Sequence, residues 1–459
     1  MSNVRRFGAA GDGVADDSDA IQHAVQDGDG MLHFSPGTYR ITRPIEMALT
    51  DVGPVGIDGT GGTARIVMDG PGPAIRLTGT HGGTGSPQSV QGNVYPDQRL
   101  PTVRNIEIEG QHEQADGIQL IQTMQCVVKG VLIRRCRHGI HLTDRNRNVS
   151  INHCHIYHNT GAGIYLEGVN LHQINIVGCH ISYNRIGGIR VERSEVRNLQ
   201  ITGNDIEYNN HIQHNSPPEP TAEIYVDTTA DGASVNEVTI ASNTIQAKPT
   251  PGGANIRIHE RPGSEDRPPG LWSITGNIVG SQENNIHITG GYGIAISGNN
   301  IYSCALRNLW IEDSSQLTVG SNVFRRHTPN LNTGVRLDRS QDIVFTGNSI
   351  LDEDAQGQAS GASLLELDGC ERINISSNQF TGGVPCAVDA AGCRGINLNG
   401  NSFHDFRSPV KSQHAVRFKA PGSGNLITGN LMGPTAAAAL SLDDKSGVTE
   451  HGNLTNSEQ

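Results

Sequence analysis

The sequence predicts an all-β protein built as a parallel β-helix, a solenoid in which successive coils stack on one another. The first observation behind this prediction is an asparagine that recurs in one short motif: a strand residue, Gly or Ser, Asn, any residue, and a hydrophobic residue. The recurring positions are Asn204, Asn243, Asn277, Asn299, Asn322, Asn348, Asn378, Asn401 and Asn430. Their spacing runs from 22 to 39 residues, with a short unit of 22 to 25 residues and insertions. A repeat of this period is typical of a solenoid.

The second observation is alternation inside each repeat. In stretches such as HQINIVG and GIRVERS, every second residue is Ile, Val or Leu, which indicates strands. Leucine-rich repeats have similar lengths, but their leucine consensus and helical segment are absent from this sequence. Asn suits the turn that follows a strand, because it tolerates left-handed backbone and can bond the Asn of the next coil.

Composition agrees with one long, turn-rich domain. The chain has 57 Gly among 459 residues and 4% aromatic residues. It has no apolar run near the roughly 20 residues of a membrane span, so no membrane partner is expected. The repeat continues from about residue 105 to 430 without a low-complexity linker. We therefore expect a single domain over 1–459, with an N-terminal cap at 1–35, about a dozen coils at 36–438 and a C-terminal tail at 439–459.

Cysteine usage and charge argue against a zinc-binding protein and a nucleic-acid-binding protein. Cys154 and Cys179 hold the position of the recurring Asn, which suits stacked, reduced, buried thiols, and we expect the same of Cys370, Cys386 and Cys393. No CxxC pair occurs, so no metal site is expected. The N-terminus lacks the apolar core of a signal peptide, which predicts a cytoplasmic protein or a mature secreted one. A net charge of −12 argues against a nucleic-acid partner.

The N-terminal segment carries a family resemblance. VRRFGAAGDGVADDSDAIQHAV, followed by LHFSPGTYRI, resembles the opening of the pectate-lyase-like superfamily, which includes polygalacturonase-type hydrolases, fructotransferases and phage tailspikes. The resemblance implies a single-stranded right-handed parallel β-helix, and its tailspike members imply a homotrimer as one oligomeric state. The residues agree with a capping helix that starts at Asp17 or Ser18, ends near Val25, and covers the open end of the coils with Ile21 and Ala24.

Function is expected on the outward face of one strand per coil. Aligning GIQLIQ, GIHLTD, GIYLEG, GIRVER, EIYVDT, NIRIHE, NIHITG, NLWIED, GVRLDR and LLELDG points the Ile, Leu and Val residues inward. The first outward column reads Gln119, His141, Tyr165, Arg190, Tyr225, Arg257, His287, Trp310, Arg336 and Glu366. The second reads Ile121, Thr143, Glu167, Glu192, Asp227, His259, Thr289, Glu312, Asp338 and Asp368. A solvated surface is expected to carry small polar residues, so these large functional side chains favour binding or catalysis.

The second column predicts a catalytic acid pair that involves Glu192 and its neighbours Glu167 and Asp227. Adjacent coils lie about 4.8 Å apart. Retaining glycosidases need carboxyl groups about 5 to 5.5 Å apart, and inverting ones about 6.5 to 9.5 Å. Stacked acids repel one another, so at least one should have a raised pKa and act as a general acid. The predicted substrate-binding residues are His141, Tyr165, Arg190, Tyr225, Arg257, His259 and Trp310.

These residues predict a glycoside hydrolase or transglycosidase acting on an oligo- or polysaccharide without a cofactor, and the arginines favour an anionic one. Proline-rich insertions near residues 209–221 and 260–270 are expected to wall a groove. Alternatively, Arg190 and Arg257 only neutralise the acids as a surface ion-pair network. Asp116 and His138 are the second choice for catalysis, because QADGI and RHGI resemble polygalacturonase segments, although the paired aspartates expected between them are missing.

Two further functions remain open. A polysaccharide lyase would remove a proton from a uronate with His or Tyr, neutralise its carboxylate with Arg, and use calcium if the acids bind that ion. The residues for elimination would be His141, Tyr165, Arg190, Tyr225, Arg257 and His259. The other alternative is a glycan-binding, tailspike-like or structural β-helix without catalytic activity, with Tyr165, Tyr225 and Trp310 stacking on sugars.

Overall fold

The computed structural model describes residues 2–83, 86–209, 222–260, 270–328, 330–352, 354 and 362–455. It confirms the all-β parallel solenoid, with about 16 turns in place of the predicted dozen and 6% helix. The chain divides into two compact units, unit 1 at Met1–Thr239 and unit 2 at Ile240–Gln459, which are described separately. The single-domain organisation stays a prediction. No helix among the described residues is long and apolar enough to cross a membrane.

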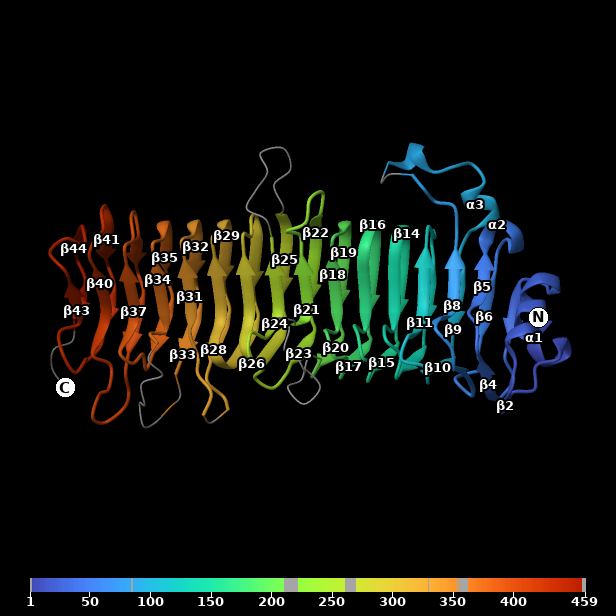
Figure 1. Ribbon diagram of the computed structural model, residues 1–459. Helices are drawn as coiled ribbons and strands as arrows, with labels where there is room; N and C mark the ends of the chain where they lie inside the picture. The colour runs from blue at the N-terminus through green and yellow to red at the C-terminus, as the bar shows by residue number, and fades with distance from the viewer. Residues whose placement is uncertain are drawn as a thin grey trace. The chain divides into compact units, whose positions relative to one another are not determined.

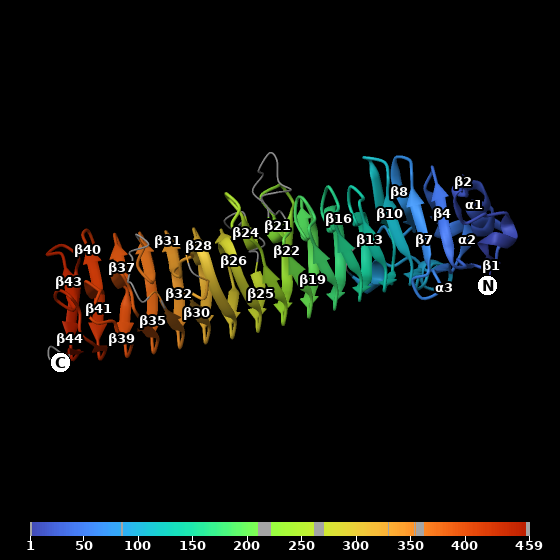
Figure 2. The same ribbon diagram turned by 90° about the horizontal axis from the view of Figure 1, so that it is seen from below.

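The predicted N-terminal helix is present as α1 (Ser18–Asp27), between β2 (Asp12–Asp16) and β3 (Met31–His33). β1 (Ser2–Asn3) and the 3-10 helix η1 (Val4–Phe7) precede it. α1 buries Ile21, Ala24 and Val25. Figure 2 shows it beside β2 and β4 at the end of the unit 1 coils. Asp17 does not cap the helix with its side chain, because its carboxylate accepts hydrogen bonds from the Ala10 and Gly11 N–H groups instead.

Three parallel sheets form the coils of unit 1, and each coil places one strand in each sheet (Figure 1). The first sheet holds β5 (Ile45–Ala48), β8 (Gly72–Thr78), β11 (Ala115–Ile121), the first parts of β14 (Ile140–Asn152) and β16 (Ile164–Val177), β18 (Ile189–Glu192) and β21 (Ala222–Asp227). The second holds β1, β3, β6 (Gly56–Asp58), β9 (Thr102–Arg104), β12 (Val127–Lys129), the second parts of β14 and β16, and β19 (Glu195–Thr202).

The third sheet of unit 1 holds β2, β4 (Gly37–Ile41), β7 (Ala64–Met68), β10 (Glu107–Gly110), β13 (Leu132–Arg134), β15 (His155–Tyr157), β17 (His180–Ser182) and β20 (Asp205–Glu207). Short helices α2 (Leu49–Val52), η2 (Pro87–Ser89) and α3 (Val94–Asp97) occupy connections. β22 (Ser234–Ala241) crosses the boundary between the units.

Unit 2 repeats the three-sheet arrangement. Its first sheet holds β24 (Ala254–His259), the second parts of β26 (Ile278–Thr289) and β28 (Asn300–Glu312), β31 (Val335–Asp338), β34 (Leu365–Asp368), β37 (Cys386–Ala391), β40 (His414–Lys419) and β43 (Leu440–Leu442). Its second holds β25 (Gly270–Thr275), β27 (Ile294–Ser297), β29 (Ser315–Gly320), β32 (Gln341–Thr346), β35 (Glu371–Ser376), β38 (Asn397–Asn399), β41 (Asn425–Thr428) and β44 (Val448–His451). Its third holds β23 (Thr244–Gln246), the first parts of β26 and β28, β30 (Val323–Arg325), β33 (Ser349–Leu351), β36 (Gln379–Thr381), β39 (Ser402–His404), β42 (Leu431–Met432) and β45 (Leu454–Thr455).

The recurring asparagines form the predicted ladder inside unit 2. Asn277 Nδ2 donates to Asn299 Oδ1 at 3.0 Å, and Asn299 Nδ2 donates to Asn322 Oδ1 at 2.9 Å. The left-handed residue is the Gly or Ser before each Asn, such as Gly298 at φ 65° and Ser321 at φ 56°, and not the Asn itself. That residue makes the turn and directs the carboxamide into the core, where its polar groups are satisfied by neighbouring coils.

A second asparagine ladder in unit 1 was not predicted. Asn159 Nδ2 donates to Asn184 Oδ1 at 2.8 Å, and Asn184 Nδ2 donates to Asn209 Oδ1 at 2.7 Å. Each of these residues follows a strand of the third sheet in HIYHN, HISYN or DIEYN, so the sequence does contain the repeat. Cys154 and Cys179 occupy rungs as predicted, and all eight cysteines are buried and free.

The predicted C-terminal tail at 439–459 is wrong over its described part, residues 439–455. β43, β44 and β45 pair with β40, β41 and β42 and continue the coils. Asn453 in HGNLT supplies another rung, since its Oδ1 accepts from Asn430 Nδ2 at 2.9 Å. The polar composition of this segment concealed a repeat whose turns and rung are intact.

Candidate functional site

The structure confirms the strand alignment that defines the outward columns of unit 1. The pairs between neighbouring strands run Gln119–His141–Tyr165–Arg190–Tyr225 and Ile121–Thr143–Glu167–Glu192–Asp227. The intervening residues, such as Ile164 and Leu166, are fully buried. A shift of one residue in any coil would turn its acid into the core, so this register places the candidate residues on one face.

Glu192 is held by a bidentate ion pair. Arg190 donates from Nε at 2.7 Å and from Nη2 at 2.6 Å, and the Tyr165 hydroxyl donates at 2.7 Å. The Glu192 side chain is only 15% exposed. Burial alone favours the neutral acid, but the hydrogen bonds and charge of Arg190 outweigh it and lower the pKa of Glu192 below its ordinary value. The expectation of a raised pKa is therefore wrong for this residue.

His141 and Glu167 form a second pair that is joined to the first through Tyr165. His141 Nε2 lies 3.0 Å from Glu167 Oε2, and the imidazole stacks on the Tyr165 ring at 5.3 Å. Arg193 Nη2 donates to Glu167 and, at 3.3 Å, to the Tyr165 hydroxyl. Burial, followed by the hydrogen bond to Glu192, raises the pKa of Tyr165, so this phenol stays protonated.

Asp116 and His138, the second choice from sequence, lie against the same residues. Arg137 binds Asp116 through two hydrogen bonds of 2.9 and 2.6 Å, and the backbone N–H of His138 donates to the same carboxylate. The His138 ring is 5.3 Å from His141 and 5.0 Å from Tyr165. Burial lowers the pKa of His138 to about 4. Its Nδ1 accepts from the Ala162 N–H, which leaves the proton of the neutral ring on Nε2.

The first-choice and second-choice residues thus form one constellation, which we call cluster 1. It also contains two arginines that the sequence analysis missed, Arg137 and Arg193. Their side chains are 46% and 54% exposed, whereas Arg190 is 9% exposed. The members of cluster 1 are Asp116, Arg137, His138, His141, Tyr165, Glu167, Arg190, Glu192 and Arg193.

Arg193 follows directly after the outward acid of its coil and has a left-handed backbone with φ 51°. The same place is taken by Asp144 and Gly168 in the two preceding coils, and both also have positive φ. This position therefore recurs at a fixed offset from the columns. An alignment extended by one residue would have identified it.

Tyr225 and Asp227 extend the columns by one coil. The Arg190 guanidinium lies over the Tyr225 ring at 4.4 Å. The Tyr225 hydroxyl donates to Asp227 at 3.2 Å, and Thr229 donates to the other carboxylate oxygen from its N–H and its hydroxyl. Burial raises the pKa of Tyr225 to about 12. Asp227 is therefore engaged in local hydrogen bonds with Tyr225 and Thr229.

The remaining predicted binding residues belong to unit 2. Arg257 and His259 lie on β24, and Arg257 Nη2 donates to Thr289 Oγ1 at 3.0 Å. Trp310 stacks on His287 with ring centroids 4.4 Å apart, and its Nε1 donates to Asp338 at 2.8 Å. The predicted groove walls at 210–221 and 261–269 lie outside the described residues.

The described acids are not gathered for a metal ion. Within residues 2–83, 86–209, 222–260, 270–328, 330–352, 354 and 362–455, no group of three or more His, Cys, Asp or Glu side chains is arranged to hold one. Glu167 and Glu192 each contact an arginine. These two acids therefore do not fit a calcium site.

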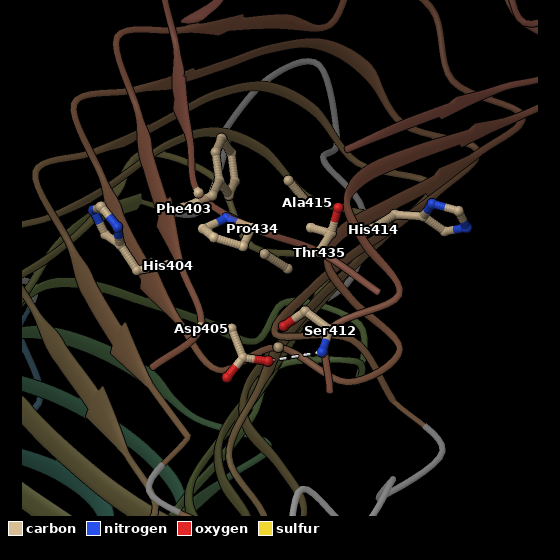
Figure 3. A pocket seen from close by; sticks show the side chains of 11 residues that line it. Phe403, His404, Asp405, Ser412, His414, Ala415, Pro434 and Thr435 are labelled. Atoms are coloured by element: carbon tan, nitrogen blue, oxygen red, sulfur yellow. Dashed lines mark hydrogen bonds between the residues drawn. The ribbon is translucent and has the colours of Figure 1, made fainter. Parts of the chain in front are cut away.

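A separate pocket in unit 2 is lined by residues that include Phe403, His404, Asp405, Ser412 and His414 (Figure 3). The Asp405 carboxylate accepts from the N–H groups of Lys411 and Ser412 at 2.8 and 2.7 Å, and from Arg407. Burial opposes its charge, but these donors lower the pKa of Asp405 far below its ordinary value. This carboxylate holds its loop in place and does not offer a reactive group.

Comparisons with known proteins agree with the coil architecture. Residues 89–245 and 208–408 match the family model for the right handed beta helix region, and residues 1–53 match the model for rhamnogalacturonase A/epimerase, pectate lyase-like. No curated protein matches the chain in sequence.

Three solved structures illustrate the likeness. The Pseudomonas phage phi297 tailspike gp61 is 13% identical over 98% of this chain and 83% of that chain, with a TM-score of 0.50. The A-module of the Azotobacter vinelandii mannuronan C-5 epimerase AlgE6 is 16% identical over 100% of both chains, with a TM-score of 0.40. The catalytic unit of a GH87 alpha-1,3-glucanase from Streptomyces thermodiastaticus is 14% identical over 100% of this chain and 70% of that chain, with a TM-score of 0.38. Such identities concern the fold alone. Since the matched family model covers most of the sequence, the chain belongs to the right-handed β-helix family.

Proposed function

We propose that this protein is a polysaccharide-processing enzyme with its site at cluster 1, and that it cleaves a uronate-containing chain by β-elimination. The observation that carries this proposal is the distribution of protons over the cluster. Glu192 is kept ionised by Arg190, while burial lowers the pKa of His138 and of His141 and keeps both imidazoles neutral. A neutral imidazole is a base, whereas an ionised carboxylate has no proton to give to a leaving group.

The residues of cluster 1 can be given definite roles in an elimination. Arg193 and Arg137 are the exposed guanidinium groups, and they would neutralise the uronate carboxylate and acidify the proton at C5. The His141 tautomer that carries its proton on Nε2 would donate to Glu167, 3.0 Å away, and would leave the Nδ1 lone pair as the base. Removal of the C5 proton forms the C4–C5 double bond and breaks the C4–O bond. Tyr165 would protonate the departing oxygen, with Arg193 beside its hydroxyl to stabilise the phenolate.

Hydrolysis or transfer of a glycosidic bond is the second candidate, and one observation favours it. Glu167 and Glu192 are paired positions on adjacent strands, which corresponds to a separation of about 4.8 Å between strands and suits a retaining pair. That mechanism needs one of the two acids protonated at the working pH. The ion pair with Arg190 lowers the pKa of Glu192 and opposes protonation of that acid.

The test is an assay with polygalacturonate, alginate and a neutral glucan. Elimination predicts ultraviolet absorbance from the new double bond with the uronates and none with the glucan. Tyr165→Phe should lower turnover by at least about 10²-fold, as expected for loss of a general acid. Tyr183→Phe is the matched control, because Tyr183 is 38% exposed and follows β17 in the third sheet of unit 1.

Other results of this assay would identify the protein as a hydrolase or as a glycan-binding protein. New reducing ends without absorbance, abolished by Glu167→Gln, Glu192→Gln or Asp227→Asn, would establish hydrolysis. Saturable binding without any product would establish a glycan-binding β-helix, in which Tyr165 and Tyr225 contact the sugar. Either result would refute elimination.

A further inference from the structure

Unit 2 contains a second constellation with the same layout as the central part of cluster 1. In unit 1, His141, Tyr165 and Arg190 are paired on three successive strands. In unit 2, His287, Trp310 and Arg336 are paired in the same order on β26, β28 and β31. The companion column runs Thr143–Glu167–Glu192 in unit 1 and Thr289–Glu312–Asp338 in unit 2. We call the second set cluster 2, with the members His287, Trp310, Glu312, Arg336, Asp338 and Arg339.

The histidine of cluster 2 makes the same two contacts as its counterpart in cluster 1. His287 Nε2 lies 2.7 Å from Glu312 Oε2, compared with 3.0 Å between His141 and Glu167. The His287 ring stacks on Trp310 at an interplanar angle of 1°, and the His141 ring stacks on Tyr165 at 10°. In both clusters an acid on the next coil therefore fixes the imidazole against an aromatic ring.

The aromatic residue and the arginines also correspond. Trp310 Nε1 donates to Asp338 Oδ2 at 2.8 Å, as the Tyr165 hydroxyl donates to Glu192 at 2.7 Å. Arg336 Nε donates to Asp338 at 2.8 Å, as Arg190 Nε donates to Glu192 at 2.7 Å.

Arg339 takes the place of Arg193. It has a left-handed backbone with φ 45°, and its Nη2 lies 3.7 Å from Glu312. Its side chain is 58% exposed, compared with 54% for Arg193. Arg339 also donates two hydrogen bonds to Asp313, of 2.8 and 2.9 Å. In both clusters an exposed arginine thus lies beside the acid that contacts the imidazole.

Cluster 2 lacks several of the residues that have a proposed catalytic or supporting role in cluster 1. Trp310 has no hydroxyl and cannot supply a proton to a leaving group, as Tyr165 could. The places that correspond to Asp116, Arg137 and His138 are taken by Ala254, Glu283 and Asn284. Where cluster 1 is preceded by Gln119, cluster 2 is preceded by Arg257, which adds a cation. Cluster 2 therefore keeps the histidine, the aromatic ring, the two acids and the arginines of the central part of cluster 1, and it lacks counterparts of Asp116, Arg137 and His138.

We propose that cluster 2 is a second binding site for a uronate oligosaccharide segment, which it holds without cleaving. This inference rests on the proposed function for the class of ligand, and on cluster 2 alone for the existence of the site. Arg339 would pair with a sugar carboxylate, and Arg336, which is 31% exposed, would assist. One Asp338 oxygen is buried without a hydrogen-bond partner among the described residues, so cluster 2 retains an unused acceptor beside these cations.

Tryptophan fluorescence tests this proposal directly, because the chain has 2 Trp and Trp272 is only 2% exposed. Trp272→Phe leaves Trp310 as the only reporter. Titration with galacturonate and alginate oligosaccharides should give a saturable change in its emission, and glucose oligomers should give none. Adding Arg339→Gln should weaken the apparent affinity at least about fivefold. Arg394→Gln is the matched control, since Arg394 lies in unit 2, is 70% exposed and pairs with Glu371 at 3.8 Å.

The outcomes separate this inference from the proposed function. A saturable response of Trp310 without any cleavage product would support the second site and refute elimination. Elimination without a response of Trp310 to any of the uronate oligosaccharides would refute the second site alone. An equal loss of affinity in Arg339→Gln and Arg394→Gln would also refute it, because a general charge effect would then explain the binding.

Discussion

Replacement of Asn299 by Ala tests the asparagine ladder of unit 2. Asn299 is 2% exposed, and its Oδ1 accepts from both the N–H and the Nδ2 of Asn277 at 3.0 Å. Its own Nδ2 donates to the Ile274 carbonyl at 2.9 Å and to Asn322 Oδ1 at 2.9 Å. The substitution removes all of these bonds at a buried position.

The expected loss in the free energy of unfolding follows from the donors of Asn277 that the substitution leaves without a partner. Asn277 loses the acceptor for its N–H and for one Nδ2 hydrogen, and each buried donor without a partner costs about 1 to 3 kcal/mol. The free energy of unfolding should therefore fall by about 2 to 6 kcal/mol. For a unit of this size, each kcal/mol lowers the melting temperature by about 2 to 4 °C. We expect a loss of at least about 4 °C.

The neighbouring Asn300 supplies the control, since it is exposed at the start of β28. Asn300→Ala should change the free energy of unfolding by no more than about 0.5 kcal/mol. Thermal unfolding followed by circular dichroism compares the two variants. Hydrogen exchange at the amides of Asn277 and Asn299 should locate the loss in the coils next to the substitution. Equal melting temperatures for Asn299→Ala and Asn300→Ala would refute the ladder as a source of stability.

Three more predictions concern charge and pH in cluster 1. Glu192→Gln should lower the free energy of unfolding by about 1.5 to 3 kcal/mol, because it leaves the buried Arg190 without its anion. Glu167→Gln, at a side chain 35% exposed, should cost less, and an equal cost in thermal unfolding would contradict this account. The folded pKa of Glu192 is lowered, so its contribution to stability is present above its ordinary pKa and is lost as pH falls through the folded value. Burial lowers the pKa of His138 to about 4, so the unfolded chain binds its proton first and stability should fall between about pH 6.5 and 4. Melting temperatures across this range should decline less steeply for His138→Asn than for the native chain, and parallel profiles would contradict the assignment.

Local regularity explains how much of the fold could be predicted. Period-two alternation identifies strands, and the rung motif fixes where each coil turns, so the alignment of His141, Tyr165 and Arg190 followed from short-range sequence alone. The ladder through Asn159, Asn184 and Asn209 and the last coil at Asn453 follow the same repeat, but they were not predicted. The motif of the ladder is shorter than that of the recurring asparagines, and the last coil lies in a polar segment.

The sequence by itself determined the coil type, the outward columns and the residue types available for chemistry, because these depend on neighbours within a few residues. Only the tertiary structure decided which of these residues contact one another, how deeply they are buried and which of them are charged. The stacking of coils joined Asp116 and His138 to the predicted residues, brought Arg193 onto Glu167, and placed the Tyr165 hydroxyl against Glu192. The alternation already placed Arg190 beside Glu192 on one face of the same strand, but the burial of both side chains and the hydrogen bond from Tyr165 on the neighbouring coil, which also act on the pKa of Glu192, depend on the stacked coils. The correspondence between His141 and His287 likewise became visible as matching contacts only after the coils were stacked.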